Sequence, residues 1–489
     1  MKKPTAFFTL ICSILLISAQ SDLSGDWSGF LKLTGFDLKL IYTIKKTGSN
    51  NPLLAYTSTL SVPQQNAKNI PIDKTLVDGK EILLYSYNLN AEFKGEIDDE
   101  GFLEGVFKQS GQTFPLKLIK TLDIKTFDRP QTPTPPYPYN VKEVSFYNQA
   151  GNIKFYGTVT SPIVNVDSII PTIILLSGSG SQDRDETLFD HKPFAVLADL
   201  LTRNGFAVLR VDDRGAGKTK CSPKLLNYTT SDIVDDATSY MRFAMDSISR
   251  GKPIFIIGHS EGAHIAAVLA HQFPAEVKAI VSLAPPLVSG AEINSFQNKI
   301  AVQQFLNKKE TKTFIVLHDS LIQLLIKQSQ KLETKTSTEE LKQIIETQIQ
   351  NWQNLNSKRA VNRIKKKFKK LYKKEFQKYI PEIYGNIFFK GKWMMEFIQT
   401  KPFSIWSTLS PDALILNGEF DQQVPVELNQ PTGERLNKRE NIEFRVVPNT
   451  NHLFQTTSNG SVAEYSNIEE TLSPKVLEQI KEFVLKNQF

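Results

Sequence analysis

The pentapeptide Gly258-His259-Ser260-Glu261-Gly262 stands between a short apolar run, residues 253–257, and a segment rich in helix formers, residues 263–270. It has the pattern G-x-S-x-G, and these flanks predict a strand, a sharp turn and a helix. The glycines leave room for a tight turn that holds the Ser260 hydroxyl clear of the backbone, at the positive end of the following helix. Because the pattern alone also occurs in Gly/Ser loops, its flanks carry the prediction.

The same alternation of strand and helix extends over much of the chain from residue 171 onward. Strands are predicted at 171–176, 206–211, 253–257, 277–283, 412–417 and 442–447. Helices are predicted at about 191–204, 232–249, 261–273 and 474–486. Alternation of this kind predicts an α/β fold, in which helices cover both faces of a mostly parallel sheet.

The first 20 residues have the composition of a secretory signal peptide. Lys2-Lys3 precede a short apolar stretch, and small residues follow it. We expect cleavage near Ala19 or Gln20 rather than lipid attachment at Cys12, and hence an exported protein, periplasmic or extracellular. After cleavage Cys221 is the only cysteine, which excludes an intramolecular disulfide. No later apolar run is long enough for a stable membrane span.

Residues 21–122 differ from the remainder of the chain. Short apolar segments alternate with turn signals, which predicts a small antiparallel all-β, barrel-like domain. It begins with a G-x-W-x-G pattern, in which Trp27 either fills the base of a barrel or lines a ligand cavity; we favour filling. Residues 123–140 contain a proline-rich stretch and are predicted to be a semi-rigid linker.

The predicted α/β core has two parts, residues 141–287 and 406–489, and residues 288–405 are inserted between them. The insertion is rich in Gln and Lys, nearly free of Pro and Gly, and helical in pattern. We interpret it as a cap over the strand ends, since loops that carry function gather at that edge; a helical excursion without function is the alternative. Its segment 358–374 is strongly basic. An anionic partner is conceivable there, but a solvated helix face is favoured, and export argues against nucleic acid.

A serine hydroxyl becomes a nucleophile when a base takes its proton and a carboxylate orients that base. His452 follows the last predicted strand, where such a base is expected. Asp421, in the loop after strand 412–417, is the preferred acid, and Glu419 is its competitor. We interpret His259, together with His264 and His271, as a packing or solvent-facing residue.

Two backbone N–H groups are needed to stabilise the oxyanion that forms in acyl transfer. The first is assigned to Glu261, directly after the nucleophile. The second is assigned to Ser179, in the Gly/Ser-rich loop 177–181 that follows an apolar strand. A phosphate cradle is the rival reading of this loop, but the P-loop pattern is missing. No cofactor is expected, and no metal site is expected at Asp183, Asp185 and Asp213.

With these residues assembled, the chain resembles the α/β-hydrolase family, and in particular the secreted bacterial esterases grouped with serine aminopeptidases. The motifs that carry the resemblance are residues 177–186, 213–219, 258–262, 418–421 and 451–452. The resemblance covers about half of the chain. It implies a catalytic triad of Ser260, Asp421 and His452, with loops shaped by the acidic residues of the first two motifs.

The resemblance favours hydrolysis of small-molecule carboxylic esters, with a serine aminopeptidase or dipeptidyl-peptidase-like activity as the alternative. Glu339 and Glu340 are adjacent, so they do not share a helical face on which to grip a peptide amine. Four aromatic residues of the late insertion either line an acyl pocket or fill its core: Trp393, Phe397, Phe403 and Trp406. A non-catalytic envelope binding protein is the distant alternative. The oligomeric state is not predicted.

Overall fold

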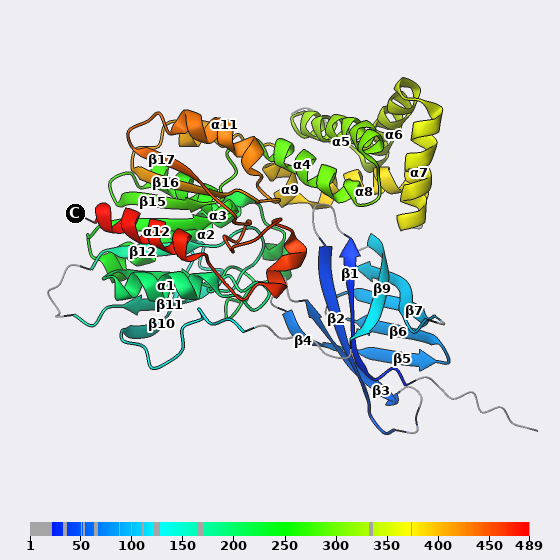
Figure 1. Cartoon of the computed structure of the whole chain (residues 1–489), viewed down its shortest axis with the longest axis horizontal. Coiled ribbons are helices and arrows are strands. Elements are labelled where there is room, and N and C mark those ends of the chain that lie inside the picture. The colour runs from blue at the N-terminus through cyan, green and yellow to red at the C-terminus, as the bar shows by residue number, and fades with distance from the viewer. Residues whose placement is uncertain are drawn as a thin grey trace, which may run out of the picture. The chain divides into compact units, whose positions relative to one another are not determined.

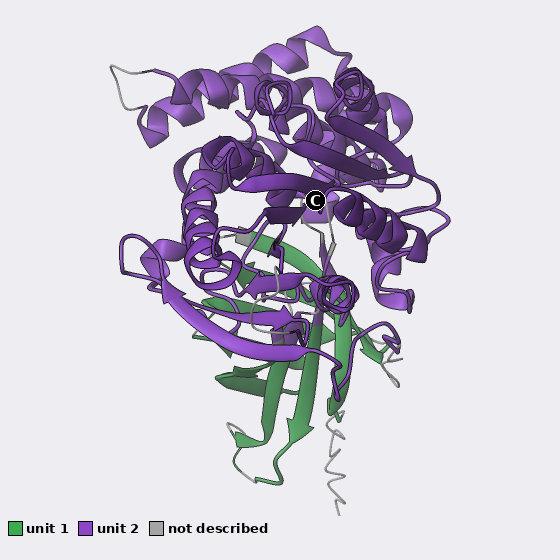
Figure 2. Cartoon of the chain, turned by 90° about the vertical axis from the view of Figure 1, so that its left-hand side faces the viewer, with its two compact units in different colours: residues 1–29, 41–60, 69–124 green, residues 30–40, 61–68, 125–489 purple. Residues whose placement is uncertain are grey.

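The computed structural model (Figure 1) describes residues 22–488 except for 33–36, 50, 52–53, 63–66, 88, 99, 110–111, 122–127, 165–169, 332–335 and 373. The predicted signal peptide and the start of the predicted linker lie outside the described residues. The chain has two compact units, coloured separately in Figure 2. The first comprises residues 1–29, 41–60 and 69–124, and the second comprises residues 30–40, 61–68 and 125–489.

The N-terminal module is a nine-stranded sheet in the order β4-β3-β2-β1-β9-β8-β7-β6-β5. Its strands are β1 (Gly25–Lys32), β2 (Asp37–Lys46), β3 (Tyr56–Val62), β4 (Ala67–Ile72), β5 (Lys74–Asp78), β6 (Glu81–Ser86), β7 (Ala91–Ile97), β8 (Leu103–Gln109) and β9 (Gln112–Thr121). The outermost strands, β4 and β5, are consecutive in the chain. A buried hydrogen bond of 2.7 Å between the hydroxyls of Ser58 on β3 and Thr75 on β5 joins one outermost strand to the neighbour of the other. The sheet is therefore nearly closed, as the predicted barrel requires.

Trp27 fills the inside of this sheet. Its side chain is 1% exposed, and its indole N–H donates to the backbone oxygen of Leu23 at 2.8 Å. Alternate residues along the strands are buried, as in β3, where every second side chain from Tyr56 to Val62 points inward. Residues at every second position of the strand thus form the inner face of the sheet.

The second sheet has eight strands in the order β10-β11-β13-β12-β14-β15-β16-β17. Its strands are β10 (Asn140–Tyr147), β11 (Lys154–Ser161), β12 (Thr172–Leu176), β13 (Ala207–Val211), β14 (Ile254–His259), β15 (Val277–Leu283), β16 (Asp412–Gly418) and β17 (Ile442–Val447). Strand β11 pairs antiparallel with both of its neighbours, β10 and β13. The six strands from β12 to β17 pair parallel with one another. The predicted α/β fold class is confirmed.

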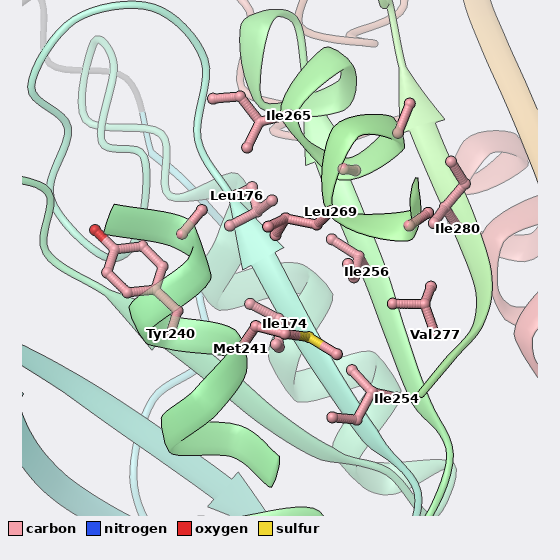
Figure 3. Close-up of a cluster of buried hydrophobic side chains, with 14 of the residues drawn as sticks. Ile174, Leu176, Tyr240, Met241, Ile254, Ile256, Ile265, Leu269, Val277 and Ile280 are labelled. Atoms are coloured by element: carbon pink, nitrogen blue, oxygen red, sulfur yellow. The ribbon is translucent and has the colours of Figure 1, made fainter. Parts of the chain in front are cut away.

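Helices cover both faces of this sheet. They are α1 (Pro193–Arg203), α2 (Thr230–Ala244), α3 (Glu261–Gln272), α11 (Val426–Leu436) and α12 (Pro474–Lys486). Side chains that alternate along the strands enter two separate cores. Ile174 and Leu176 pack with α2 and α3, as Figure 3 shows, whereas Ile173 and Leu175 pack with α1 and α12. Burial on both faces explains why these strands are continuous apolar runs.

The inserted segment forms seven helices among the described residues. They are α4 (Gly290–Gln303), α5 (Lys308–Ser329), α6 (Thr338–Leu355), α7 (Lys358–Tyr372), α8 (Phe376–Lys390), α9 (Lys392–Phe397) and α10 (Phe403–Trp406). Capping boxes begin α4 at Ser289 and α5 at Asn307. An apolar core with residues from α5 to α9 holds the insertion together. No helix in the described part of the chain is long and apolar enough to cross a bilayer.

The described end of the predicted linker is fastened to the α/β part of the chain. Arg129 donates to the backbone oxygens of Phe189, Ser466 and Ile468. The side-chain oxygen of Gln131 accepts from the backbone N–H groups of Thr471 and Leu472. Residues 128–140 are therefore bound along the fold and are not a free spacer.

Candidate active site

Ser260 lies at a strained turn between β14 and α3. Its φ of 55° and ψ of −115° are rare for a residue with a side chain, as the predicted elbow requires. The flanking glycines are dictated by close approach of the backbone. A Cβ atom at Gly258 would lie 2.2 Å from the backbone oxygen of Gly262, and one at Gly262 would lie 2.2 Å from that of Leu176. The turn is as sharp as the sequence pattern indicates.

Asp421 and His452 meet at the carboxyl ends of the last two strands. Asp421 follows β16 and His452 follows β17, and Oδ2 of Asp421 lies 2.7 Å from Nδ1 of His452. The other carboxylate oxygen accepts the backbone N–H groups of Gln423 and Val424, each at 2.8 Å. Both residues are buried. The carboxylate is thus fixed on one side by its own loop and directed on the other side at the imidazole.

The competing acid, Glu419, has a different partner. Its Oε2 accepts the backbone N–H of Asn449 at 2.9 Å, which ties the β16 loop to the start of the His452 loop. The His452 loop is also held by Asn451, whose Oδ1 accepts the backbone N–H groups of Leu453 and Gln455. Within the described residues Ser260 Oγ makes no hydrogen bond. The geometry thus brings together Asp421 and His452 and places Ser260 in the adjoining elbow.

The loop after β12 passes beside Ser260. A Cβ atom at Gly178 would lie 3.2 Å from Cβ of Ser260, so the loop approaches the elbow closely. Ser177 donates its hydroxyl to Asp213 at 2.6 Å, and this carboxylate also accepts the backbone N–H of Gln182. Burial raises the pKa of Asp213 to about 8 against these two hydrogen bonds, which lower it. The loop that contains Ser179 is therefore anchored on both sides of that residue.

The acidic residues of motifs 177–186 and 213–219 have protein partners. Asp185 forms an ion pair with Arg210. Arg184 forms an ion pair with Asp212, with Nη2 and Oδ2 separated by 2.8 Å. These charges shape the loops around the site, which is the role that the family resemblance implies for them.

His259 has a role that the sequence interpretation missed. It is neither a simple packing residue nor solvent-facing, because both ring nitrogens are bonded in a buried position. Nδ1 lies 2.8 Å from Oε1 of Glu186, and Nε2 lies 3.0 Å from the backbone oxygen of His452. Glu186 also accepts the backbone N–H of Gly178 at 2.7 Å. One carboxylate–imidazole pair therefore links the loop after β12, the elbow and the His452 loop.

Glu261 links the elbow to the inserted helices. Its carboxylate is buried and accepts hydrogen bonds from the Thr230 hydroxyl, from Nε1 of Trp393 at 2.8 Å, and from Ser179. Burial raises the pKa of Glu261, and these hydrogen bonds oppose the rise. On the same helix as Trp393, Glu396 accepts from the backbone N–H and hydroxyl of Ser231. Helix α9 therefore docks on Glu261, the residue that follows Ser260.

The four aromatic residues of the late insertion divide into two pairs. Trp393 and Phe397 stack on α9, with ring centroids 5.2 Å apart. Trp406 is fully buried in the core under the eight-stranded sheet, and Phe403 packs against that core. The second pair is therefore structural, whereas the first belongs to the helix that contacts Glu261.

Three of the other histidines make no hydrogen bond with Asp421 among the described residues. His318 lies in the core of the insertion, where Nδ1 is 2.6 Å from the Tyr384 hydroxyl. His264 is buried on α3, and burial lowers its pKa to about 4. His271 bonds the backbone oxygen of Ile405 at an exposed position.

Comparison with known proteins shows similarity to esterases and to peptidases. The family model for serine aminopeptidase S33 matches residues 191–371. Esterase EstD of Thermotoga maritima is 23% identical over 409 residues, which are 82% of this chain and 79% of the relative. Among solved structures, an esterase of Pyrococcus furiosus has a TM-score of 0.41 and 15% identity, covering 75% of this chain and 100% of that chain. Proline iminopeptidase of Mycobacterium smegmatis has a TM-score of 0.41 and 15% identity, covering 71% and 99%.

The sequence match to the family model includes the elbow, and the match to the curated relative covers most of both chains. The structure independently supplies the parallel sheet and a serine at the strained turn after β14. Together these findings show an α/β-hydrolase fold and a sequence similar to those of serine hydrolases with this fold.

Proposed function

We propose that the chain is an exported serine hydrolase that cleaves small-molecule carboxylic esters through an acyl-enzyme on Ser260. The observation that carries the proposal is the 2.7 Å contact between Asp421 and His452 next to the elbow that holds Ser260. The name of the curated relative, an esterase, supports the ester as substrate. The basic and apolar start of the sequence supports export.

In the first half of the reaction, Oγ of Ser260 attacks the ester carbonyl carbon while His452 takes the hydroxyl proton. Asp421 holds His452 in the tautomer that leaves Nε2 free to accept, and it stabilises the imidazolium that forms. The backbone N–H groups of Glu261 and Ser179 stabilise the oxyanion; one such donor contributes about 2.7–4 kcal/mol to the barrier reduction. His452 then returns the proton to the departing alcohol.

In the second half, water replaces the alcohol. His452 removes a proton from the water as its oxygen attacks the acyl carbon of the Ser260 ester. The tetrahedral intermediate collapses with release of the carboxylic acid, and His452 returns the proton to Oγ of Ser260. The net reaction consumes one ester and one water and yields one acid and one alcohol.

Peptide cleavage is the second candidate, supported by the description of the matching family model. Exopeptidases hold a free amine with carboxylates, and the candidates here are Glu396 on α9 and Glu261, which α9 contacts. Both are already bonded: Glu261 to Thr230 and Trp393, and Glu396 to Ser231. Because an additional ammonium would have to displace these donors, we favour the ester.

Two experiments test the proposal. A fluorophosphonate probe should label the wild-type chain and fail to label Ser260→Ala; an unlabelled wild type would contradict the serine hydrolase mechanism and favour a non-catalytic binding protein. A matched panel of p-nitrophenyl esters and aminoacyl or dipeptidyl anilides should then show higher kcat/KM for the esters. Faster turnover of the anilides would reverse the order of the two candidates.

A further inference from the structure

The positive charge of the chain is concentrated in one helix of the insertion. Residues 358–374 contain ten Lys or Arg residues and no Asp or Glu. The whole chain has a formal net charge of +7, so the remaining residues carry −3. Helix α7, Lys358–Tyr372, contains most of these basic residues and is visible in yellow in Figure 1. Such a local excess acts on an anionic surface even though the rest of the chain is slightly acidic.

The two faces of α7 are sharply different. Ala360, Val361, Ile364 and Phe368 are buried against the rest of the insertion. The opposite face carries a row of basic residues at spacings of four, three and four, which lie one above another on an α-helix. We call this row the basic stripe: Arg359, Arg363, Lys366 and Lys370. Because the apolar face is used internally, the stripe is what α7 presents to its surroundings.

Ion pairs neutralise several basic residues of α7, but only one of them, Arg363, belongs to the basic stripe. Glu310 on α5 pairs with Lys367 at 2.6 Å and with Arg363 at 3.1 Å. Lys369 pairs with Glu375. In contrast, Arg359, Lys366 and Lys370 are exposed and have no ion-pair partner among the described residues. Three members of the stripe therefore keep their full charge toward solvent.

An exposed apolar side chain lies at one end of the stripe. Leu355, the last residue of α6, is 85% exposed, the highest fraction among the large apolar residues in the described part of the chain. Only Asn356 and Ser357 separate it from α7, so it stands at the turn where Arg359 begins the stripe. Transfer of an exposed leucine side chain from water to an apolar phase is favourable. Leu355 would gain this free energy if the turn entered such a phase.

We propose that the α6–α7 turn and the basic stripe form a docking surface for an anionic lipid bilayer. The stripe meets lipid head groups of opposite charge, and Leu355 enters the interface beside them. A nucleic acid would also attract the basic stripe, but it has no apolar interior for Leu355. Because the stripe and the exposed leucine occur together, the bilayer is favoured. The surface is independent of Ser260 and of the proposed ester hydrolysis.

The test is sedimentation of the full chain with vesicles of phosphatidylcholine and phosphatidylglycerol in equal parts, and with vesicles of phosphatidylcholine alone. Every chain carries Ser260→Ala, so that lipid hydrolysis cannot alter the vesicles. The stripe variant combines Arg359→Gln, Lys366→Gln and Lys370→Gln. The matched control combines Lys278→Gln, Lys438→Gln and Lys475→Gln, which removes the same charge from exposed positions elsewhere. A third variant is Leu355→Ser.

Each basic residue near an anionic bilayer contributes roughly a fivefold factor in binding at moderate salt, so the stripe variant should lose about a hundredfold. The control triple should bind the mixed vesicles as the parent does, and Leu355→Ser should lose about tenfold. Equal binding of the stripe variant and the control, or equal binding of the parent to both kinds of vesicle, would overturn the proposal. So would a Leu355→Ser variant that binds unchanged.

A double-stranded oligonucleotide is the second probe. If the parent binds it more tightly than the mixed vesicles and Leu355→Ser binds it unchanged, the stripe is a nucleic-acid surface and the bilayer proposal fails. Ester hydrolysis is measured on the same substitutions with Ser260 intact and should be unchanged by the stripe variant. A parent chain with Ser260 intact that hydrolyses no ester, while vesicle binding follows the expected pattern, would count against the proposed function and leave the docking surface standing.

Discussion

Nε2 of His259 donates a hydrogen bond to the backbone oxygen of His452, 3.0 Å away, while Nδ1 of the same ring faces Oε1 of Glu186 at 2.8 Å. Both partners are acceptors, so the ring satisfies both only as an imidazolium. Burial lowers the pKa of His259, but the charge and hydrogen bond of Glu186, the oxygen of His452 and the charge of Asp421 outweigh it and raise the pKa. These contacts favour the protonated form of His259, and its Nε2–H holds the backbone of His452, the proposed base.

Replacing Glu186 with Gln should loosen this arrangement. The substitution removes the negative partner of His259 and one charged acceptor of the Gly178 N–H. Hydrogen bonds to charged groups contribute about 1.5–3 kcal/mol, so we expect kcat to fall roughly tenfold to a hundredfold with KM within about twofold. Steady-state kinetics on a p-nitrophenyl ester measures both. Glu470→Gln is the control, because Glu470 accepts the backbone N–H of Thr456 without touching either imidazole.

The two candidate acids are separated by a pair of single substitutions. Asp421→Asn leaves the shape of the loop but removes the charge that orients His452, so kcat should fall by roughly 10³–10⁴-fold. Glu419→Gln should retain kcat within about threefold, since that side chain only ties Asn449 to the loop. The same ester assay compares them, with circular dichroism as the control for folding. A greater loss in Glu419→Gln would exchange the two assignments.

The strands were predictable because each is a short, continuous run of apolar residues. The run 277–283 has the same bounds in the structure as in the prediction. Helix α11 was not predicted, because it contains Pro431 and Gly433, both of which disfavour a helix interior. A local sequence pattern thus identifies a strand or helix when the burial of its side chains is what selects its residue types.

The candidate site could be predicted only where its residues lie within, or directly after, one predicted strand or helix. The elbow is local, and the order of Ser260, Asp421 and His452 follows from the positions of the strands that precede them. The bond between Glu186 and His259 joins residues 73 positions apart, and that between Trp393 and Glu261 joins residues 132 apart. A single sequence contains no periodicity that relates such residues. Only the fold brings them into contact.

The docking of α9 on the elbow predicts a specific effect of Trp393→Phe. Phenylalanine keeps the stack with Phe397 but removes the N–H that bonds Glu261, which raises the pKa of that buried carboxyl further. The loss should destabilise the chain by about 1–3 kcal/mol and reduce kcat by up to roughly tenfold, because the backbone N–H of Glu261 is the proposed oxyanion donor.

Trp352→Phe is the matched control for this change. Its indole N–H also makes one hydrogen bond, at 2.8 Å to the backbone oxygen of Thr313, inside the insertion and away from the elbow. Thermal unfolding should show similar losses for the two variants, whereas ester turnover should fall only for Trp393→Phe. Equal turnover in both would show that α9 does not act through Glu261.

The buried His318 predicts how stability depends on pH. Burial lowers its pKa to about 4 from an ordinary value of about 6.5. Between these values the unfolded chain binds a proton that the folded chain does not, so the free energy of unfolding falls as the pH falls, by about 1.4 kcal/mol per pH unit from this residue. Above pH 6.5 the residue adds no slope.

The double substitution His318→Phe and Tyr384→Phe tests this dependence, because it removes the titrating ring and its hydroxyl partner together. Urea unfolding followed by circular dichroism at pH 7, 5.5 and 4.5 gives the slope for each chain. The double variant should lose less stability than the wild type over this range, whatever its stability at pH 7. Parallel slopes would mean that His318 binds its proton as readily in the folded chain as in the unfolded chain.

The last prediction concerns one glycine of the elbow, Gly262, and a second glycine elsewhere. Gly262→Ala would place a Cβ 2.2 Å from the backbone oxygen of Leu176, so either the turn or β12 must move, and we expect no labelling by a fluorophosphonate probe. Gly385 lies in α8 with no atom within 4 Å of such a Cβ. Gly385→Ala should therefore leave labelling intact and raise stability by about 0.5–1 kcal/mol, because alanine favours a helix. Normal labelling of Gly262→Ala would mean that the elbow tolerates a wider turn than the close contact of Gly262 with Leu176 allows.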